Sequence, residues 1–357
     1  MNNMSYVTDE MLALLEKLCN ADGVSGNESE IRKLIREELT GFVDELFTDS
    51  MGNLIATKHA TRGAKTKVLL DAHMDEVGFM IVKSGDDEFC EFRALGGIDA
   101  RALPAKVVRI GSEKVPGVIS PRTAHLTNAE ERKTIVGIDH LQITLGTEQR
   151  RKVHPGDYAA FNTNFAILGD CVAAKALDDR VGCANVIWLL KHAPADIELV
   201  GVFAVQEELG LRGATAAAYR IHPDLAFALD TTPALDPPMW DSEEINIQYN
   251  AKAGKGPVIY TVDASQIHFQ AMIDYLIHVA DQSNINYQLR QPGGGGTDSG
   301  AIHLQHDGIL SQSISVPVRY LHSPRGLMRI SDWEDTLCLL DHALQHLAEA
   351  KLTEVKQ

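Results

Sequence analysis

The stretch ELVGVFAVQEELGLRGATAAAYRIHPDLAFALD, residues 198–230, shows the fold on a small scale. It opens with ELVGVFAV, an apolar run of the length and content of a buried strand. The segment ATAAAYRI then indicates a helix, and LAFALD indicates a second strand. A strand, a helix and a strand in succession are typical of an α/β sheet whose faces are covered by helices.

The same alternation extends to both sides of this stretch. Two predicted helices open the chain, TDEMLALLEKLCNA with a Thr/Asp cap signal and NESEIRKLIREEL. Further predicted helices are LDDRVGCANVIWLLKHA, IHFQAMIDYLIHVADQS, SGAIHLQ and DWEDTLCLLDHALQHLAEAKL, and further predicted strands are VDELFTDS, NLIATKH, KVLLDAHMDE, INYQLR and SQSISVPV. We therefore predict an α/β fold, a mixed sheet with helices on both faces.

A different pattern occupies residues 76–165. Short β-like runs, AKVVRI, VPGVIS, TIVGI and DYAAF, alternate there with Gly, Pro and Asp, and no long helix is evident. We interpret this segment as an inserted β-barrel-like domain. The main domain is then split into residues 1–75 and residues 166–357.

Composition excludes several classes of function. The 357 residues carry a net charge of −16 without a basic stretch, which argues against a nucleic acid partner. No secretory leader is evident, and no apolar run approaches the roughly 18 residues of a membrane span. The five cysteines are odd in number and never spaced as CxxC, which argues against disulfides and against a thiolate metal site. We expect a cytoplasmic protein whose metal ligands, if any, are His and carboxylates.

Polar side chains gather where the predicted strands end. In open α/β sheets ligands bind beyond the carboxyl ends of the strands. Four predicted strands end there in His73, in the pair Glu207 and Glu208, in Asp230 and in His322. The LDDR segment adds Asp178 and Asp179 at a helix start, where the helix dipole favours an anion.

Each of these residues alone has an ordinary explanation as a surface histidine, a helix cap or a solvated acid. Together, two histidines and several carboxylates match the preferences of two Zn²⁺ or Co²⁺ ions. Other polar residues are less persuasive: we expect His125 in an exposed loop, and His303 and His306 lack acidic companions. In GGGGTDSG, residues 293–300, Asp298 is either a polar contact lining a pocket or a helix cap. Motifs of serine hydrolases and nucleotide-binding loops are absent.

Six segments resemble a known family. They are DAHMDEVGFMI, KALDDRVG, VQEELGLRGA, ALD, GGGGTDSGAIHL and RYLHSP. Their order and spacing resemble those of the tetrahedral aminopeptidases, the deblocking and glutamyl aminopeptidase group of dinuclear metallopeptidases, some of which are called cellulase-like. The resemblance runs from about Leu12 to Leu347 and includes the nested β-domain.

The resemblance implies a set of metal ligands and a co-catalytic metallopeptidase fold. His73 and Asp230 would bind one divalent ion, Glu208 and His322 the other, and Asp178 would bridge them, with Gly182 four residues further on as in related enzymes. The ions would be Zn²⁺ or Co²⁺, with Mn²⁺ admitted by the same ligand types.

The resemblance also implies two catalytic roles. Glu207 would act as the general base on a water that bridges the two ions. Asp75 would use its carboxylate to orient the imidazole of His73, and Asp179 would lie behind the ligands. The substrates would be peptides that lose their N-terminal residue. Dimers would assemble through the β-domain into a hollow tetrahedral dodecamer.

One departure leaves alternatives open. The family usually has an acidic residue soon after HSP, whereas this chain has Arg325 and Gly326. A scaffold or regulatory protein that keeps the fold without turnover is one alternative. A glycosidase that uses Glu207 and another carboxylate is a second, although it gives the histidines no task.

Overall fold

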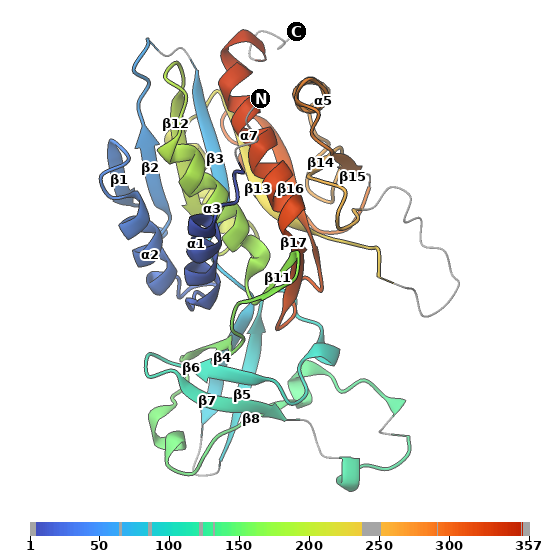
Figure 1. The fold of residues 1–357 in the computed structure, drawn as a ribbon. Helices are drawn as coiled ribbons and strands as arrows, with labels where there is room; N and C mark the ends of the chain where they lie inside the picture. Colours follow the sequence, from blue (N-terminus) through green and yellow to red (C-terminus); the bar gives the residue numbers. More distant parts are fainter. Residues whose placement is uncertain are drawn as a thin grey trace.

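The computed structural model describes residues 5–63, 66–84, 88–120, 124–130, 133–237, 251–290, 292–350 and 352 (Figure 1). Among them the α-helices are α1 (Asp9–Asn20), α2 (Ser29–Leu39), α3 (Leu177–Lys191), α4 (Arg212–Ile221), α5 (Gln270–Ser283), α6 (Ser299–Ile302) and α7 (Ile330–Ala350). The strands form two separate sheets, a large open one and a small closed barrel.

The large sheet contains β1 (Glu45–Thr48), β2 (Leu54–Lys58), β3 (Lys67–His73), β10 (Ala166–Leu168), β11 (Cys171–Ala174), β12 (Glu198–Ala204), β13 (Leu225–Pro233), β14 (Val258–Tyr260), β15 (Gln288–Arg290), β16 (Leu310–Arg319) and β17 (Gly326–Arg329). Its main path runs β1-β2-β12-β3-β13-β16-β17-β11-β10, and β14 and β15 lie off this path. The four central strands, β12, β3, β13 and β16, are parallel, and their outer neighbours β2 and β17 pair antiparallel. The predicted mixed sheet is confirmed.

The strand at the start of residues 198–230 explains why both faces are covered. In β12, Leu199 and Phe203 belong to one hydrophobic core, whereas Val200 and Val202 belong to another. Successive side chains of a strand point to opposite faces, so a continuous apolar run must be buried on both. Figure 1 shows α1, α3 and α7 over one face, and α4 and α6 contribute to the core on the other.

The N-terminal helices follow their predicted signals. The side chain of Thr8 accepts a hydrogen bond from the backbone N–H of Met11, which caps α1. The buried residues of α2, Ile31, Ile35 and Leu39, repeat every four residues and pack into the larger core. Of the helices that the structure describes, none combines the length and apolar character that a membrane crossing requires.

The barrel contains β4 (Gly78–Ser84), β5 (Phe89–Leu95), β6 (Val107–Ile110), β7 (Val115–Ser120), β8 (Gln142–Thr144) and β9 (Tyr158–Phe161). They close in the order β4-β5-β8-β7-β6-β9, which confirms the barrel-like insertion. The predicted strand TIVGI is wrong: Ile135 is 63% exposed, and the segment leads into a 3₁₀ helix at Ile138–His140. The domain boundaries at 75/76 and 165/166 stay a prediction, because membership of a sheet does not show independent folding.

Candidate metal centre

Asp178 lies at the centre of two groups of metal-ligand side chains. One carboxylate oxygen, Oδ1, is 3.1 Å from His73 Nε2, and the other, Oδ2, is 3.0 Å from His322 Nε2. Among the described residues, two groups have ligand atoms within 4.8 Å of one another: His73, Asp178 and Asp230, and Asp178, Glu208 and His322. One carboxylate is thus shared by two potential coordination sites.

The first group is built on the sheet. His73 is the last residue of β3, and Asp230 lies within the neighbouring β13, with 3.9 Å between His73 Nε2 and Asp230 Oδ1. Asp230 was expected at a strand end, but β13 continues to Pro233 along β16. Its pairing with β3 stops at Ala228, so the carboxylate of Asp230 lies beyond the last paired residue and faces the centre.

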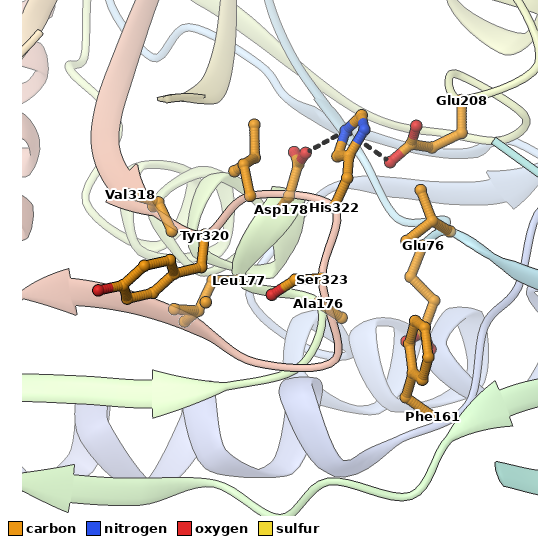
Figure 2. Close-up of a pocket in the computed structure, with 13 residues that line it drawn as sticks. Glu76, Phe161, Ala176, Leu177, Asp178, Glu208, Val318, Tyr320, His322 and Ser323 are labelled. Atoms are coloured by element: carbon orange, nitrogen blue, oxygen red, sulfur yellow. Dashed lines mark ion pairs between the residues drawn. The ribbon is translucent and has the colours of Figure 1, made fainter. Parts of the chain in front are cut away.

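The second group comes from loops that follow β12 and β16. Glu208 lies four residues beyond β12, and its Oε1 is 3.3 Å from His322 Nε2. His322 lies three residues beyond β16 in a left-handed conformation with φ +54°. Figure 2 shows His322 between the carboxylates of Asp178 and Glu208.

A turn before the regular part of α3 positions Asp178. Asp178 and Asp179 have non-helical backbone angles, and the peptide bond between them is cis. Oδ1 of Asp179 accepts a hydrogen bond from the N–H of Gly182 at 2.9 Å, so Asp179 caps the helix while Asp178 is directed to the histidines. A Cβ on Gly182 would lie 2.2 Å from the Asp179 carboxylate, which explains the glycine.

Asp75 contacts both His73 and the acidic pair Glu207 and Glu208. The hydrogen bond to His73 Nδ1 is accepted by the backbone carbonyl of Asp75 at 3.2 Å, whereas its carboxylate Oδ1 is 3.6 Å away. The carboxylate instead accepts hydrogen bonds from Ser25 Oγ at 2.5 Å, from the N–H of Glu207 at 3.0 Å and from the N–H of Glu208 at 3.3 Å. The carboxylate of Asp75 therefore holds the backbone of Glu207 and Glu208. Its backbone carbonyl binds Nδ1 of His73, so that Nε2 faces the centre.

Burial dominates the electrostatics of the acids. It raises the pKa of Asp230 and of Glu207 well above the usual range, and burial followed by the charge of Asp178 raises the pKa of Glu208 to about 7. Asp178 differs: burial raises its pKa, but hydrogen bonds with His322 and His73 outweigh this and hold it far below the usual range. Buried carboxylates this close together remain ionised only next to positive charge.

The donor atoms fit divalent metal ions. Imidazole nitrogens and carboxylate oxygens suit Zn²⁺, Co²⁺ and Mn²⁺, and neither group includes a cysteine. Glu208 Oε1 is buried without a hydrogen bond, although it faces His322. Both histidines donate Nδ1–H to backbone carbonyls, His73 to Asp75 and His322 to Gly97, which is the usual support for a metal-binding Nε2.

A pocket opens beside the second group. It lies between Asp178, Glu208 and His322 on one side and Phe161 of the barrel on the other (Figure 2). The remaining lining residues include Glu76, Val77, Leu177, Tyr320 and Ser323. The centre is therefore open to a ligand at the junction of sheet and barrel.

Other predicted residues lie outside the two groups. His125 is exposed, His303 bonds the carbonyl of Ser299, and His306 stacks on Tyr219. Arg325 is exposed, and its guanidinium donates to the carbonyl of Asn164 at 3.3 Å, so this departure from the family pattern contacts the chain between β9 and β10.

Asp298 is buried and makes no capping bond to α6. Burial, followed by the charge of Asp71, raises its pKa well above the usual range. Asp298 stands at the N-cap position of α6 but is not among the residues that line the pocket, so neither expectation is met in full. Asp71 was missed, although its place two residues before His73 on one strand put it on the same face.

A buried ion cluster behind the centre was also missed. We call Glu76, Lys175 and Arg180 the Glu76 cluster; each is at most 2% exposed. Lys175 Nζ lies 2.7 and 2.8 Å from the two carboxylate oxygens of Glu76, and Arg180 donates to Glu76 at 3.3 Å. All three occur within DAHMDE and KALDDR, so the motifs contained this signal beside the ligands.

Comparison with known proteins identifies the family of this chain. The family model for M42 glutamyl aminopeptidase matches residues 52–339. A provisionally named aminopeptidase of Acetivibrio thermocellus is 38% identical over 94% of this chain and 99% of its own length. The structure of a TET aminopeptidase from a marine sediment Thaumarchaeota archaeon superposes with a TM-score of 0.88 at 30% identity, covering 95% of this chain and 98% of that one. The TET1 peptidase of Pyrococcus horikoshii superposes with a TM-score of 0.80 at 33% identity, covering 93% of this chain and 98% of that one. That peptidase can assemble into a tetrahedron or a large octahedral shell. The chain therefore belongs to the M42 glutamyl aminopeptidase family, a family of metal-dependent peptidases.

Proposed function

We propose that the protein is a dinuclear metallo-aminopeptidase that removes N-terminal residues from peptides. The observation that carries this proposal is the position of Asp178, whose two carboxylate oxygens each lie about one hydrogen bond from a different histidine, at 3.1 and 3.0 Å. A bridging carboxylate flanked by two histidines and two further carboxylates is the donor set of a two-ion site.

The proposal assigns each ligand to one ion. His73 and Asp230 would hold one divalent ion, Glu208 and His322 the other, and Asp178 both. Bound Zn²⁺, Co²⁺ or Mn²⁺ would supply Lewis acidity, which polarises a peptide carbonyl and lowers the pKa of water.

Glu207 is the proposed general base. Its Oε2 lies 3.9 Å from His73 Nε2, so the carboxylate faces the centre without belonging to either ligand group. Burial raises the pKa of Glu207, which brings it closer to the pH at which a base exchanges protons efficiently. Its backbone is fixed by the carboxylate of Asp75, so Glu207 can take a proton from water and return it to the leaving amine.

The assembly and location follow from the same relatives and from the cysteines. Because related TET peptidases form closed shells, we propose a homo-oligomer, with dimers assembling into a tetrahedral dodecamer through the inserted domain. None of the five cysteines forms a disulfide, which supports a reducing, cytoplasmic environment.

The test is metal analysis together with hydrolysis of a panel of aminoacyl chromophores, for the wild type, Glu207→Gln and Glu208→Gln. We expect two metal ions per chain in the wild type. Glu207→Gln should keep both and lose about 10²–10⁴-fold in kcat, since it removes only the base. Its neighbour Glu208→Gln should lose metal as well as activity.

Three results would overturn parts of the proposal. A wild type without metal under metal-replete conditions would reduce the centre to buried acids. Metal binding without hydrolysis of any peptide would favour the scaffold alternative. Hydrolysis of a glucan that resists chelators would favour a carboxylate-pair glycosidase.

A further inference from the structure

We propose that the barrel completes the second metal position, with Gly96 and Gly97 of the loop after β5 as positioning residues for Glu208 and His322. This inference rests on the proposed function. It assigns the inserted barrel a role within the metal centre itself, in addition to assembly or access. Two contacts carry it, one to each ligand.

The first contact fixes the ring of His322. Its Nδ1 lies 2.9 Å from the carbonyl oxygen of Gly97, so Nδ1–H donates to the barrel loop. Nε2 faces Asp178 and Glu208 at 3.0 and 3.3 Å, and after loss of its proton it would present a lone pair to an ion held by the same carboxylates. The side chain of His322 is 35% exposed, so the bond to Gly97 supports a ring that is not enclosed by the core.

The second contact confines the side chain of Glu208. A Cβ on Gly96 would lie 3.2 Å from Glu208 Oε2 and 3.3 Å from Glu208 Cβ, and only 2.7 Å from Val77. Gly96 also has a φ of +87°, a backbone conformation that residues other than glycine rarely adopt. Glycine therefore allows the barrel backbone to pack directly against the metal ligand.

The loop is anchored close to the centre on the barrel side. Leu95, the last residue of β5, pairs with Gly78 of β4, which follows directly on Glu76 and Val77. The barrel is also tied to the helical part of the main domain, since Arg109 of β6 donates to Asp22, and Lys114 Nζ lies 3.4 Å from that carboxylate. Movement of the barrel would therefore displace Gly97 and with it the support of His322.

The first metal position has no such dependence. His73 donates Nδ1–H to Asp75 at 3.2 Å within the segment that follows its own strand, and its side chain is 3% exposed. The inference thus predicts that a disturbance of the barrel loop weakens the second position and spares the first.

The experiment compares Gly96→Ala with Gly156→Ala in the full-length chain. Gly156 is a matched control in the same barrel: its φ is +95°, and a Cβ there meets nothing within 4 Å. Both variants place alanine at a similar positive φ, but only the Cβ at residue 96 meets other atoms, those of Val77 at 2.7 Å and of Glu208 at 3.2 Å. Zn²⁺ affinity would be measured by competition with a chromophoric chelator, and the coordination of Co²⁺ by its absorption spectrum.

We expect Gly96→Ala to weaken one of the two ions by about 10- to 100-fold, the range for loss of a residue that supports a metal ligand. The other ion should bind as in the wild type, and Gly156→Ala should bind both. A Gly96→Ala protein that binds both ions with wild-type affinity would overturn the inference, as would equal losses in the two variants.

A milder variant guards against misfolding. Gly97 lies outside the left-handed region, and a Cβ there would come 3.4 Å from His322 Nδ1. Gly97→Ala should fold and weaken the same ion to a smaller extent, and an unchanged affinity and Co²⁺ spectrum would count against the inference. Failure of the proposed function itself would look different, because the wild type would then bind no metal.

Discussion

The two halves of the proposed metal centre differ in how they are held. His73 and Asp230 come from β3 and β13 in the middle of the sheet, whereas Glu208 and His322 come from loops, and the side chain of His322 is 35% exposed. The imidazole of His73 is supported by its own segment, and that of His322 by the barrel. Each half contributes one histidine and one carboxylate, but the two histidines are supported by different parts of the fold.

The largest effect should come from the residue that both halves share. Asp178→Asn removes one negative charge and replaces an acceptor oxygen that faces a histidine with an amide, so both ions should be lost and kcat/KM should fall by about 10³-fold or more. Metal analysis and peptide hydrolysis measure this.

Asp179→Asn is the matched control for this change. Asn also caps helices, so this variant should keep its metal and most of its activity. If Asp178→Asn retained two ions, Asp178 would not be the bridge.

The Glu76 cluster supports both halves at once, because it ties together the segments that carry His73 and Asp178. Lys175→Met leaves the carboxylate of Glu76 with one cation and should lower the free energy of unfolding by about 3–5 kcal/mol. Urea denaturation of the metal-free chain measures this.

The double variant Glu76→Gln, Lys175→Met should recover nothing, because Arg180 then stays buried without the carboxylate that faced it. Lys152→Met, which breaks an exposed pair with Glu113, should leave the urea midpoint nearly unchanged. Equal effects of Lys175→Met and Lys152→Met would contradict the structural role of the cluster.

Removal of metal should separate the halves. A chelator added in steps should take the ion of Glu208 and His322 first, because loop ligands are held less rigidly than the strand ligands, and we expect the two affinities to differ by about tenfold or more. His322→Ala should abolish the weaker phase only. A single phase of metal loss in the wild type would show that the halves are energetically equal.

The sequence was most informative where the structure depends on local pattern. The apolar run of β12 and the cap at Thr8 act through neighbouring residues, so they could be recognised directly. The barrel depends on pairings between distant segments, such as β4 with β9, which no local pattern reveals. TIVGI shows the limit, because β-branched residues without a pairing partner do not form a strand.

The site shows the same division. The rule that ligands gather at the carboxyl ends of strands brought His73, Glu208 and His322 together correctly in space. It gave no indication of the Gly97 carbonyl, because any residue has a carbonyl and its position depends on how the barrel packs. The role that the resemblance implies for Asp75 stays a prediction: its carboxylate lies 3.6 Å from His73 Nδ1 and also accepts hydrogen bonds from the backbone N–H groups of residues 207 and 208.

The smallest predicted effect is a pH dependence of stability that comes from His322 and Glu208, the second half of the centre. In the metal-free chain, burial lowers the pKa of His322, but the hydrogen bond and charge of Asp178 raise it from 6.5 to about 10, and that of Glu208 is raised from 4.5 to about 7. Both groups bind protons more tightly when folded, so their contribution to stability is complete at low pH and is lost as pH rises from about 4.5 to 10.

Metal binding must displace these protons, so the stabilisation by metal has the opposite slope. The difference in Tm between metal-loaded and chelated protein should therefore widen between pH 5.5 and pH 9. His322→Ala removes one of the two titrating groups and should reduce the widening of the Tm difference. Asp230→Asn changes the first half only, so the part of the widening that comes from His322 should remain. If the two melting curves stayed parallel across that range in the wild type, the protons at His322 and Glu208 would not compete with the ion, and the second half would lose its proposed place in the metal centre.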